Sequence, residues 1–267
     1  MRSEWFRDWR IWKYCIDYFP IKLVKTCDLD SNKNYLVLAY PHGLLMMSPW
    51  FLASSNASGF KNEYPGMTSY LATVQTRFSI PFERELVVYG GCCIATEECL
   101  LYLLDEKKHK GNFVMINTGG SAEAILTRKD QYNLYLKNRK GFARIALKSG
   151  ASIVPMFSFG ENKLFDGVAF KPNTLLGKFQ NWVRDVTKFA LIPPLGRGFF
   201  QYSFGMIPHR VPVHIVVGAP LEVGRVPEPT QAQVDELHAR LVSSLRALYD
   251  QHKHQYEPDP DTPLNII

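Results

Sequence analysis

The short apolar run Tyr35–Tyr40, which ends at a proline, is the feature that most constrains how this chain can fold. A run of this length, bounded by polar residues, suits a buried strand and is far too short to span a bilayer. Pro41 has no amide hydrogen and fixes its own φ, so we expect the strand to end there. Comparable apolar runs predict further strands at Ser69–Val74, Asn112–Asn117, Ile153–Phe157 and Val213–Val217.

Helical segments alternate with these strands. Thr96 is followed by two glutamates, which suit the first turn of a helix. A basic helix is expected from Arg139 to its stop at Gly150, and Thr230 with Gln233 forms a capping box for a long helix that reaches about His254. This alternation predicts an α/β fold with a mostly parallel central sheet flanked by helices on both faces.

The composition is that of a globular protein with phosphate-bearing or anionic partners. The 267 residues are 46% hydrophobic, enough for one large domain, and the net charge is +6. A basic balance favours anionic lipid or phosphorylated ligands, and no nucleic-acid-binding motif is present, so we expect no nucleic-acid partner. The five cysteines form no CxxC pair, and we predict no metal site.

The N-terminus interleaves aromatic and basic residues. Trp5, Trp9 and Trp12 are spaced to share one face of a helix, Arg7 and Arg10 stand between them, and Lys13 follows. Such a helix suits a membrane interface, where Trp favours the headgroup level and basic residues favour anionic lipid. The alternative, compatible with the first, is a helix that packs its aromatic face on the domain.

His42 is the main candidate for chemistry. It stands in Tyr40-Pro41-His42-Gly43, directly after the predicted strand. Imidazole titrates near neutral pH, so a histidine placed at a strand end can accept a proton from an alcohol. Gly43 allows a sharp turn or a close approach to substrate. The alternative is a histidine that only packs in the turn.

A glycine-rich turn, Thr118-Gly119-Gly120-Ser121-Ala122-Glu123, follows another predicted strand. It has the outline of a phosphate or oxyanion loop. It lacks the Gly-Lys-Ser/Thr of a Walker loop, and the residues after Ser121 do not form a nucleophile elbow. Further along, Arg144 and Lys148 are four residues apart and share a face of the basic helix.

Seven short segments, in this order, carry a family resemblance between about Trp12 and Pro258. They are Asp17-Tyr18-Phe19-Pro20-Ile21, Pro41-His42-Gly43, Tyr70-Leu71-Ala72-Thr73, Gly119-Gly120-Ser121-Ala122-Glu123, Asn138-Arg139-Lys140-Gly141-Phe142, Val154-Pro155 with Phe159-Gly160-Glu161-Asn162, and Gly196-Arg197-Gly198. In these the chain resembles the type-2 diacylglycerol acyltransferase family, which includes monoacylglycerol and wax-alcohol acyltransferases.

The resemblance implies transfer of a fatty acyl group from acyl-CoA, as co-substrate and without a cofactor, to diacylglycerol or a related lipid alcohol. It implies the cytosolic face of the endoplasmic reticulum membrane or lipid droplets; a homo-oligomer is compatible with it. His42 would be the base, Gly43 or the Gly119 and Gly120 amides would supply oxyanion donors, and Glu123 would orient the imidazole. The substrate-binding residues would be Pro41, Gly119, Gly120, Arg139, Lys140, Arg144 and Lys148, of which the basic ones meet the CoA phosphates. The alternatives are a solvated helix face for the basic residues and a cap or salt-bridge partner for Glu123.

The chain departs from the family at two points, and at a further position it lacks the acid of a related acyltransferase class. Tyr40 stands where animal members usually have a histidine, and Met47 stands where the related glycerol-phosphate acyltransferases have an aspartate. Members commonly have a hydrophobic hairpin before the Asp-Tyr-Phe-Pro-Ile segment. In this chain only sixteen residues precede Asp17, and none form a span, so we expect an interfacial rather than a polytopic protein. The alternatives are a lipid-binding pseudoenzyme and a hydrolase with Ser121 as nucleophile. We divide the chain into a membrane-interface segment (1–30), an acyltransferase domain (31–256) and a loose C-terminal tail (257–267).

Overall fold

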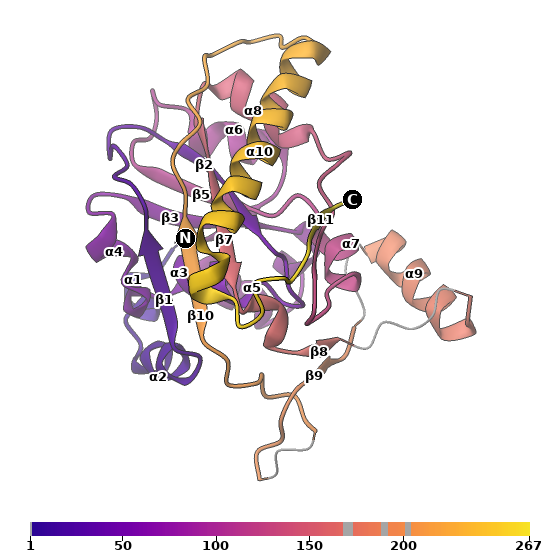
Figure 1. Ribbon diagram of the computed structural model, residues 1–267. Helices are drawn as coiled ribbons and strands as arrows, with labels where there is room; N and C mark the ends of the chain where they lie inside the picture. The colour runs from indigo at the N-terminus through magenta and orange to yellow at the C-terminus, as the bar shows by residue number, and fades with distance from the viewer. Residues whose placement is uncertain (1, 168–172, 188–191, 201–203) are drawn as a thin grey trace.

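A seven-stranded, mostly parallel sheet forms the centre of the molecule (Figure 1). The computed structural model describes residues 2–167, 173–187, 192–200 and 204–267. Every neighbouring pair of strands in this sheet is parallel except β10 with β7. The strand order is β1 (Ile21–Lys25), β10 (Val213–Val217), β7 (Ser152–Phe159), β2 (Tyr35–Tyr40), β5 (Asn112–Ile116), β3 (Thr68–Thr73) and β4 (Cys92–Ile94).

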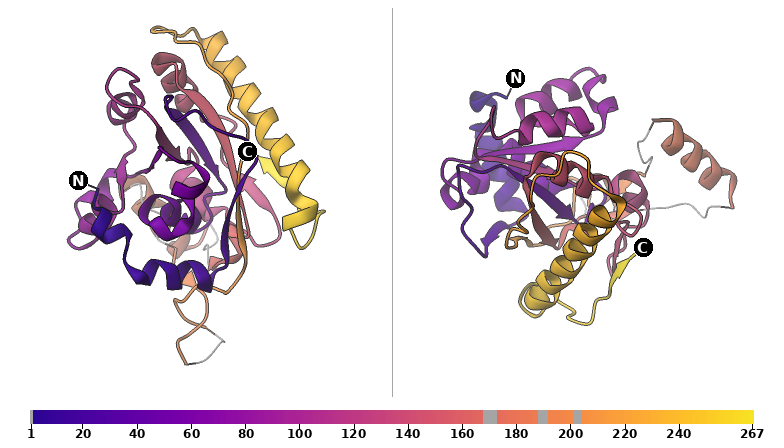
Figure 2. Two further views of the ribbon diagram at one scale, coloured as in Figure 1. Left: turned by 90° about the vertical axis from the view of Figure 1, so that its left-hand side faces the viewer. Right: turned by 90° about the horizontal axis from the view of Figure 1, so that it is seen from above.

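Helices cover both faces of the sheet, as the two views of Figure 2 show. Tyr35, Val37 and Ala39 of β2 belong to one apolar core, while the alternate residues Leu36 and Leu38 belong to another. The first core includes side chains of α1 (Glu4–Arg7), α2 (Arg10–Tyr18), α3 (Met47–Ser54) and α4 (Phe60–Glu63). The second includes side chains of α6 (Glu97–Leu104), α8 (Gly141–Ser149) and α10 (Gln231–Tyr256). The predicted α/β architecture is confirmed.

Local signals placed the main elements well. The strands predicted at Tyr35–Tyr40 and Val213–Val217 have those bounds, and Thr96 accepts a hydrogen bond from the backbone of Cys99 at the start of α6. Thr230 and Gln233 form the predicted capping box of α10. The remaining elements are α5 (Glu83–Tyr89), α7 (Gly120–Ile125), α9 (Leu175–Thr187), β6 (Tyr132–Leu134), β8 (Asp166–Gly167), β9 (Pro194–Leu195), β11 (Leu264–Ile266) and short 3₁₀ turns η1 (Asn56–Ser58), η2 (Gln75–Phe78) and η3 (Glu161–Lys163).

The three N-terminal tryptophans do not share one helical face, and that prediction was wrong. The helix is interrupted between α1 and α2, so the spacing of a single helix no longer applies. Trp5 is exposed, whereas Trp12 is buried and its indole N–H donates to the carbonyl oxygen of Phe6 at 2.6 Å. Arg7 is also buried and donates to Asn56 and to the carbonyl of Gly90. Some of the N-terminal aromatic and basic side chains therefore pack inside the protein and are not available to contact a membrane.

Neither predicted domain boundary separates an independent segment. Residues 1–30 include β1, which extends the central sheet by pairing with β10 along Ile21–Lys25. The tail 257–267 is not loose, because β11 pairs with β6 in parallel and Tyr249 donates to the carbonyl of Thr262. The prolines of the tail favour extended backbone, and extended backbone is compatible with a short paired strand as well as with the loose tail that was predicted. Within the described ranges, no helix is both long and apolar enough to cross a bilayer.

Candidate active site

The site lies where three neighbouring parallel strands end. His42 follows β2, Glu123 follows β5, and Glu161 follows β7, and β5 and β7 are the two strands that flank β2. Because the three strands are parallel, their carboxyl ends meet at one edge of the sheet. This edge is where ligands commonly bind in open α/β sheets. The topology thus brings a histidine between two acids that are remote from it in sequence.

Glu123 holds the backbone at His42 rather than its imidazole ring. Its Oε1 accepts the His42 backbone N–H at 2.6 Å, and its Oε2 accepts the backbone N–H of Tyr135 at 3.0 Å. The His42 ring contacts the carbonyl oxygen of Gly43 through Nδ1 at 3.1 Å. The predicted orienting role of Glu123 on the imidazole was therefore wrong, because both carboxylate oxygens are engaged by other donors. Burial raises the pKa of Glu123 to about 7.

Asn117 connects the strand ends and was not identified from the sequence. Its Nδ2 donates to the carbonyl of Ala39 at 2.9 Å and to Glu123 Oε1 at 3.0 Å. Its Oδ1 accepts the backbone N–H groups of Gly119 at 2.8 Å and Gly120 at 2.9 Å. Since Asn117 already uses these amides, they are not positioned as oxyanion donors, and that prediction was wrong. The two glycines instead shape the loop around Asn117.

Glu161 supports the other side of the His42 turn. Its carboxylate accepts the backbone N–H groups of Met47 at 2.8 Å and Ser48 at 3.0 Å, the first residues of α3. Burial raises the pKa of this carboxyl as well. Glu161 belongs to the segment Phe159-Gly160-Glu161-Asn162 and was not predicted to be a site residue. The acidic partner of Met47 is therefore Glu161, which follows β7 and accepts hydrogen bonds from backbone amides.

Gly43 is required where it stands. Its φ is +58°, a region that side chains with a Cβ disfavour. A Cβ added at this position would lie 2.6 Å from Cγ of Glu161. Among the described residues, no acceptor is hydrogen-bonded to the Gly43 N–H. The Gly119 and Gly120 amides already donate to Asn117, so among the predicted oxyanion donors in the described residues the Gly43 N–H is the one left to bind a ligand.

The electrostatic setting keeps His42 neutral. Burial disfavours the imidazolium form, and the nearby charge of Arg77 acts in the same direction, so the pKa of His42 falls to about 4. A neutral imidazole can accept a proton at the pH of a cell.

Tyr40, just before the turn, is fully buried and its hydroxyl lies 2.5 Å from Oγ1 of Thr118. This hydrogen bond joins the ends of β2 and β5.

Arg139 and Lys140 lie beside the site. With Asn117 and Thr118 they line a cavity of about 360 Å³ at the end of β5. The Lys140 ammonium is 2.8 Å from the Asp235 carboxylate, and the Arg139 guanidinium lies over the ring of Tyr135. These residues can meet an anionic ligand close to the His42 edge. His42 itself does not line this cavity.

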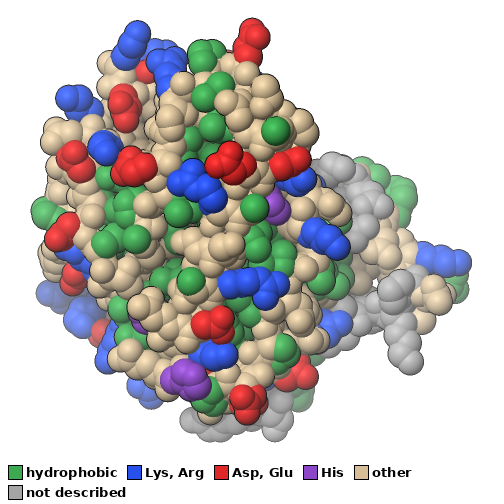
Figure 3. Space-filling view, turned by 45° about the horizontal axis from the view of Figure 1, so that its top comes forward, with side chains coloured by type: hydrophobic (Ala, Val, Ile, Leu, Met, Phe, Trp, Pro, Cys, Tyr) green, Lys and Arg blue, Asp and Glu red, His purple; other side chains and the backbone are tan. Residues whose placement is uncertain are grey.

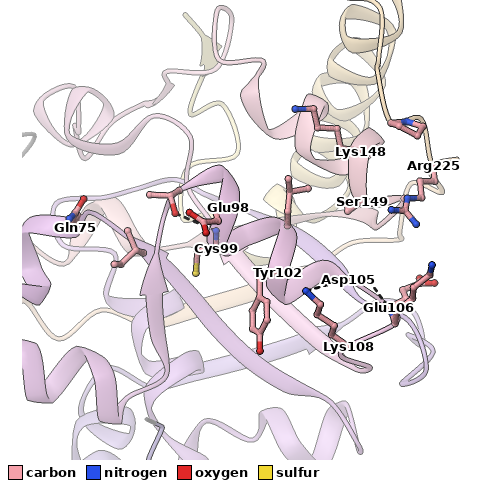
Figure 4. A pocket seen from close by; sticks show the side chains of 16 residues that line it. Gln75, Glu98, Cys99, Tyr102, Asp105, Glu106, Lys108, Lys148, Ser149 and Arg225 are labelled. Carbon is pink, nitrogen blue, oxygen red and sulfur yellow. Dashed lines mark hydrogen bonds and ion pairs between the residues drawn. The ribbon is translucent and has the colours of Figure 1, made fainter.

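Lys148 is at the other end of α8, away from Arg139 and Lys140. It lines a separate cavity of about 1130 Å³ (Figure 4). Its ammonium group pairs with the carboxylate of Glu97 at 2.5 Å. In this view Lys148 and Arg225 lie at one end of the cavity and Gln75 at the other. Arg144 is exposed on the helix surface between them. The four basic residues predicted to meet CoA therefore do not converge on one site.

The structure gives no support to a hydrolase that uses Ser121. Ser121 is the second residue of α7, a short helix that begins at Gly120. Across the part of the chain that the structure describes, no hydrogen bond joins its hydroxyl to His42. Nucleophilic serine needs a base within hydrogen-bonding reach.

Comparisons with known proteins agree on one family. The family model "Diacylglycerol acyltransferase" matches residues 1–267. Human "Diacylglycerol O-acyltransferase 2-like protein 6" is 42% identical over 259 residues, covering 96% of this chain and 77% of that protein. Bovine "2-acylglycerol O-acyltransferase 1" is 41% identical over 255 residues (96% and 76%), and human "Acyl-CoA wax alcohol acyltransferase 1" is 40% identical over 255 residues (96% and 77%).

Solved structures also match this chain, and one of them can be described. It is the 1-acyl-sn-glycerophosphate acyltransferase PlsC from Thermotoga maritima, which is 12% identical and covers 90% of this chain and 76% of its own. The TM-score is 0.46.

Proposed function

Because this chain belongs to the diacylglycerol acyltransferase family and is therefore an acyltransferase, we propose that it transfers a fatty acyl group from acyl-CoA to diacylglycerol, giving triacylglycerol. His42 is the general base of this reaction. The observation that carries the proposal is the placement of a neutral imidazole between two buried acids at the carboxyl edge of the sheet. Both acids fix the backbone around the histidine, so the base is preorganised.

The proposed chemistry needs one base and one oxyanion donor. His42 accepts the proton of the acceptor hydroxyl as its oxygen attacks the thioester carbonyl. The tetrahedral intermediate carries its negative charge on the former carbonyl oxygen, for which the Gly43 N–H is the candidate donor. Collapse breaks the carbon–sulfur bond, and the CoA thiolate takes the proton from His42. The ester, free CoA and the neutral base are recovered, and no covalent enzyme intermediate is needed.

Acyl-CoA is proposed to reach His42 from the side of Arg139 and Lys140. These two basic residues line the cavity that also contains Asn117 and Thr118, next to the strand ends. Charge-assisted hydrogen bonds to phosphate suit both side chains. Lys148 lines a different cavity, so the CoA role is assigned first to Arg139 and Lys140. Pro41 and the Gly119–Gly120 loop border the same edge.

A monoacylglycerol or a long-chain alcohol is the second candidate acceptor. Relatives of nearly equal similarity are named as 2-acylglycerol and wax-alcohol acyltransferases. We place the reaction at a membrane surface, on the cytosolic face of the endoplasmic reticulum or on lipid droplets, because the acceptors are lipids. The alternative to be tested is a pseudoenzyme, which keeps the fold and binds lipid but does not catalyse acyl transfer.

The test is acyl transfer from labelled oleoyl-CoA in microsomes that express the chain. Diacylglycerol, monoacylglycerol and a fatty alcohol serve as parallel acceptors. We expect triacylglycerol from the wild type and none from His42→Ala, while His254→Ala, at an exposed histidine near the end of α10, retains activity. Product from another acceptor would reassign the substrate. Absence of any product from the correctly localised wild type would contradict the proposal.

A further inference from the structure

The connection between β7 and β10 leaves the sheet and returns to it at the edge that holds His42. β7 is parallel to β2, so its end lies with the end of β2 at that edge. β10 is antiparallel to β7 and therefore begins at the same edge. The intervening residues 166–212, here called the excursion, contain β8, α9 and β9. In Figures 1 and 2, α9 stands away from the body of the protein.

The described residues of the excursion expose large apolar side chains. On α9 the spacing of Leu175, Phe179, Trp182 and Val186 places them on one helical face, and each is exposed. After β9, the side chains of Phe199 and Phe200 are exposed to 82% and 102%. Phe204 and Met206 are also largely exposed. Large apolar side chains that are exposed in such number are typical of an interaction site.

The excursion is also the main source of the chain's positive charge. Its sequence contains six Lys and Arg against two Asp, so it supplies +4 of the net charge of +6. Lys178 lies on α9 between the exposed apolar positions, and Figure 3 shows green and blue side chains together on the protrusion at the right. Aromatic and aliphatic side chains combined with basic ones are the chemistry of elements that rest in an anionic bilayer interface.

The return segment of the excursion is packed against α2. Tyr18 donates through its hydroxyl to the carbonyl of Pro208 at 3.0 Å, and Arg210 donates through Nε to the carbonyl of Tyr18 at 3.2 Å. Ile11 and Tyr14 of α2 are themselves exposed. The excursion therefore adjoins the N-terminal aromatic segment predicted to meet lipid. The excursion and the N-terminal aromatic segment can therefore face the same membrane.

We propose that the described parts of the excursion, α9 and the segment around Phe199, Phe200, Phe204 and Met206, form a docking surface for a bilayer of anionic phospholipid. The apolar side chains enter the headgroup–acyl boundary and the basic side chains meet the anionic headgroups. Both ends of the excursion are fixed at the His42 edge, so docking holds that edge toward the membrane. Only this last consequence rests on the proposed acyl transfer.

Vesicle flotation of the full chain tests the docking surface. The vesicles contain phosphatidylcholine alone or mixed with phosphatidylserine, at low salt. We expect binding to the mixed vesicles and a loss of roughly tenfold or more in Phe199→Ser/Phe200→Ser and in Phe179→Ser/Trp182→Ser, because buried apolar groups and basic charge supply the affinity. Phe82→Ser/Tyr102→Ser, at exposed aromatic positions outside the excursion, is the matched control and should bind as the wild type does.

The charge contribution is tested separately with Lys178→Glu. This variant should lose binding to the mixed vesicles and show no change with pure phosphatidylcholine, because the lysine acts through anionic headgroups. Thermal unfolding of every variant checks that the fold is kept. Equal loss in the Phe82/Tyr102 control, or unchanged binding in both excursion variants, would overturn the proposal. So would a change from dimer to monomer in sedimentation without any change in vesicle binding, which would make the surface a contact between copies.

Docking and catalysis can fail independently, and a soluble substrate distinguishes them. With a short-chain diacylglycerol dissolved as monomers, the excursion variants should acylate at the wild-type rate, whereas with diacylglycerol in mixed vesicles they should be slow. Wild type that floats but makes no product from either substrate contradicts the proposed function and leaves docking intact. Active wild type that does not float contradicts docking alone.

Discussion

Glu123 Oε1 lies 2.6 Å from the backbone nitrogen of His42 and accepts its hydrogen bond. The acid thus fixes the position of His42 through its peptide group, and the imidazole ring is left to contact the carbonyl oxygen of Gly43. An acid that binds the imidazole would stabilise its charged form, whereas this arrangement does not. The low pKa of His42 and the raised pKa of Glu123 follow from the same buried setting.

The first prediction concerns stability and pH. The pKa of Glu123 is about 7 in the folded protein against an ordinary value of 4.5, so between these values the folded state binds more protons than the unfolded state. Stability therefore falls as pH rises from about 4.5 to 7, by up to ~3 kcal/mol from this group. Glu123→Gln cannot titrate and should lack this part of the slope. Urea unfolding of both proteins across the range measures the difference; parallel slopes would contradict it.

The second prediction is the pH dependence of catalysis. Since the pKa of His42 is lowered to about 4, the base remains neutral well below pH 6. The acid limb of kcat/KM assigned to His42 should have its midpoint near pH 4, away from the ordinary value of 6.5. The profile is measured in Glu123→Gln, so that titration of the neighbouring acid does not contribute. A midpoint near 6.5 in that variant would mean that the imidazole is solvated.

The third prediction separates backbone strain from a steric clash. Gly43 and Gly120 have similar positive φ angles, +58° and +52°, but only a Cβ at Gly43 meets a neighbour, Glu161. Gly120→Ala should lower the free energy of unfolding by about 1–2 kcal/mol, the cost of left-handed backbone. Gly43→Ala should cost about 1–3 kcal/mol more, because the new methyl group must displace a buried carboxylate. Equal losses in denaturant unfolding would show that Glu161 moves freely.

The fourth prediction concerns acyl-CoA binding. Arg139→Ala should raise KM for oleoyl-CoA by about tenfold through the loss of a charge-assisted hydrogen bond to phosphate. Lys148→Ala, in the last turn of α8, is the matched control, because its ammonium lies in another cavity and pairs with Glu97. Its KM should change by less than roughly twofold. If the two variants change KM equally, CoA extends along the whole of α8.

The fifth prediction concerns the connection between the strand ends. Asn117→Asp replaces a donor that reaches the Ala39 carbonyl and Glu123 with an acceptor, so three acceptors would face one another. We expect a loss of about 3 kcal/mol or more in the free energy of unfolding. Asn265→Asp, in the partly exposed strand β11, should cost less than about 1 kcal/mol. Similar losses at both positions would contradict the central role of Asn117.

Local patterns were sufficient for most of the fold. The strand at Tyr35–Tyr40 and the cap at Thr230 depend on residues close in sequence, and both were predicted correctly. The tryptophan spacing failed because the chain turns after Arg7, which becomes buried beneath other segments. The partners in the site are set by tertiary contacts. Glu123 is 81 residues from His42, and Glu161 is 114 residues from Met47, so no local spacing could show what their oxygens bind.

The reversed direction of β10 beside β7 has a consequence for how this protein can diversify. The polypeptide departs from and rejoins adjacent strands on one side of the sheet, so the intervening insert can be lengthened, shortened or exchanged without altering the order of any strand. A chimaera that receives the corresponding insert of a relative would keep the catalytic framework and acquire a new way of choosing its lipid surface. If the excursion is the docking surface proposed above, the choice of membrane and the acyl transfer can be exchanged separately within a single domain.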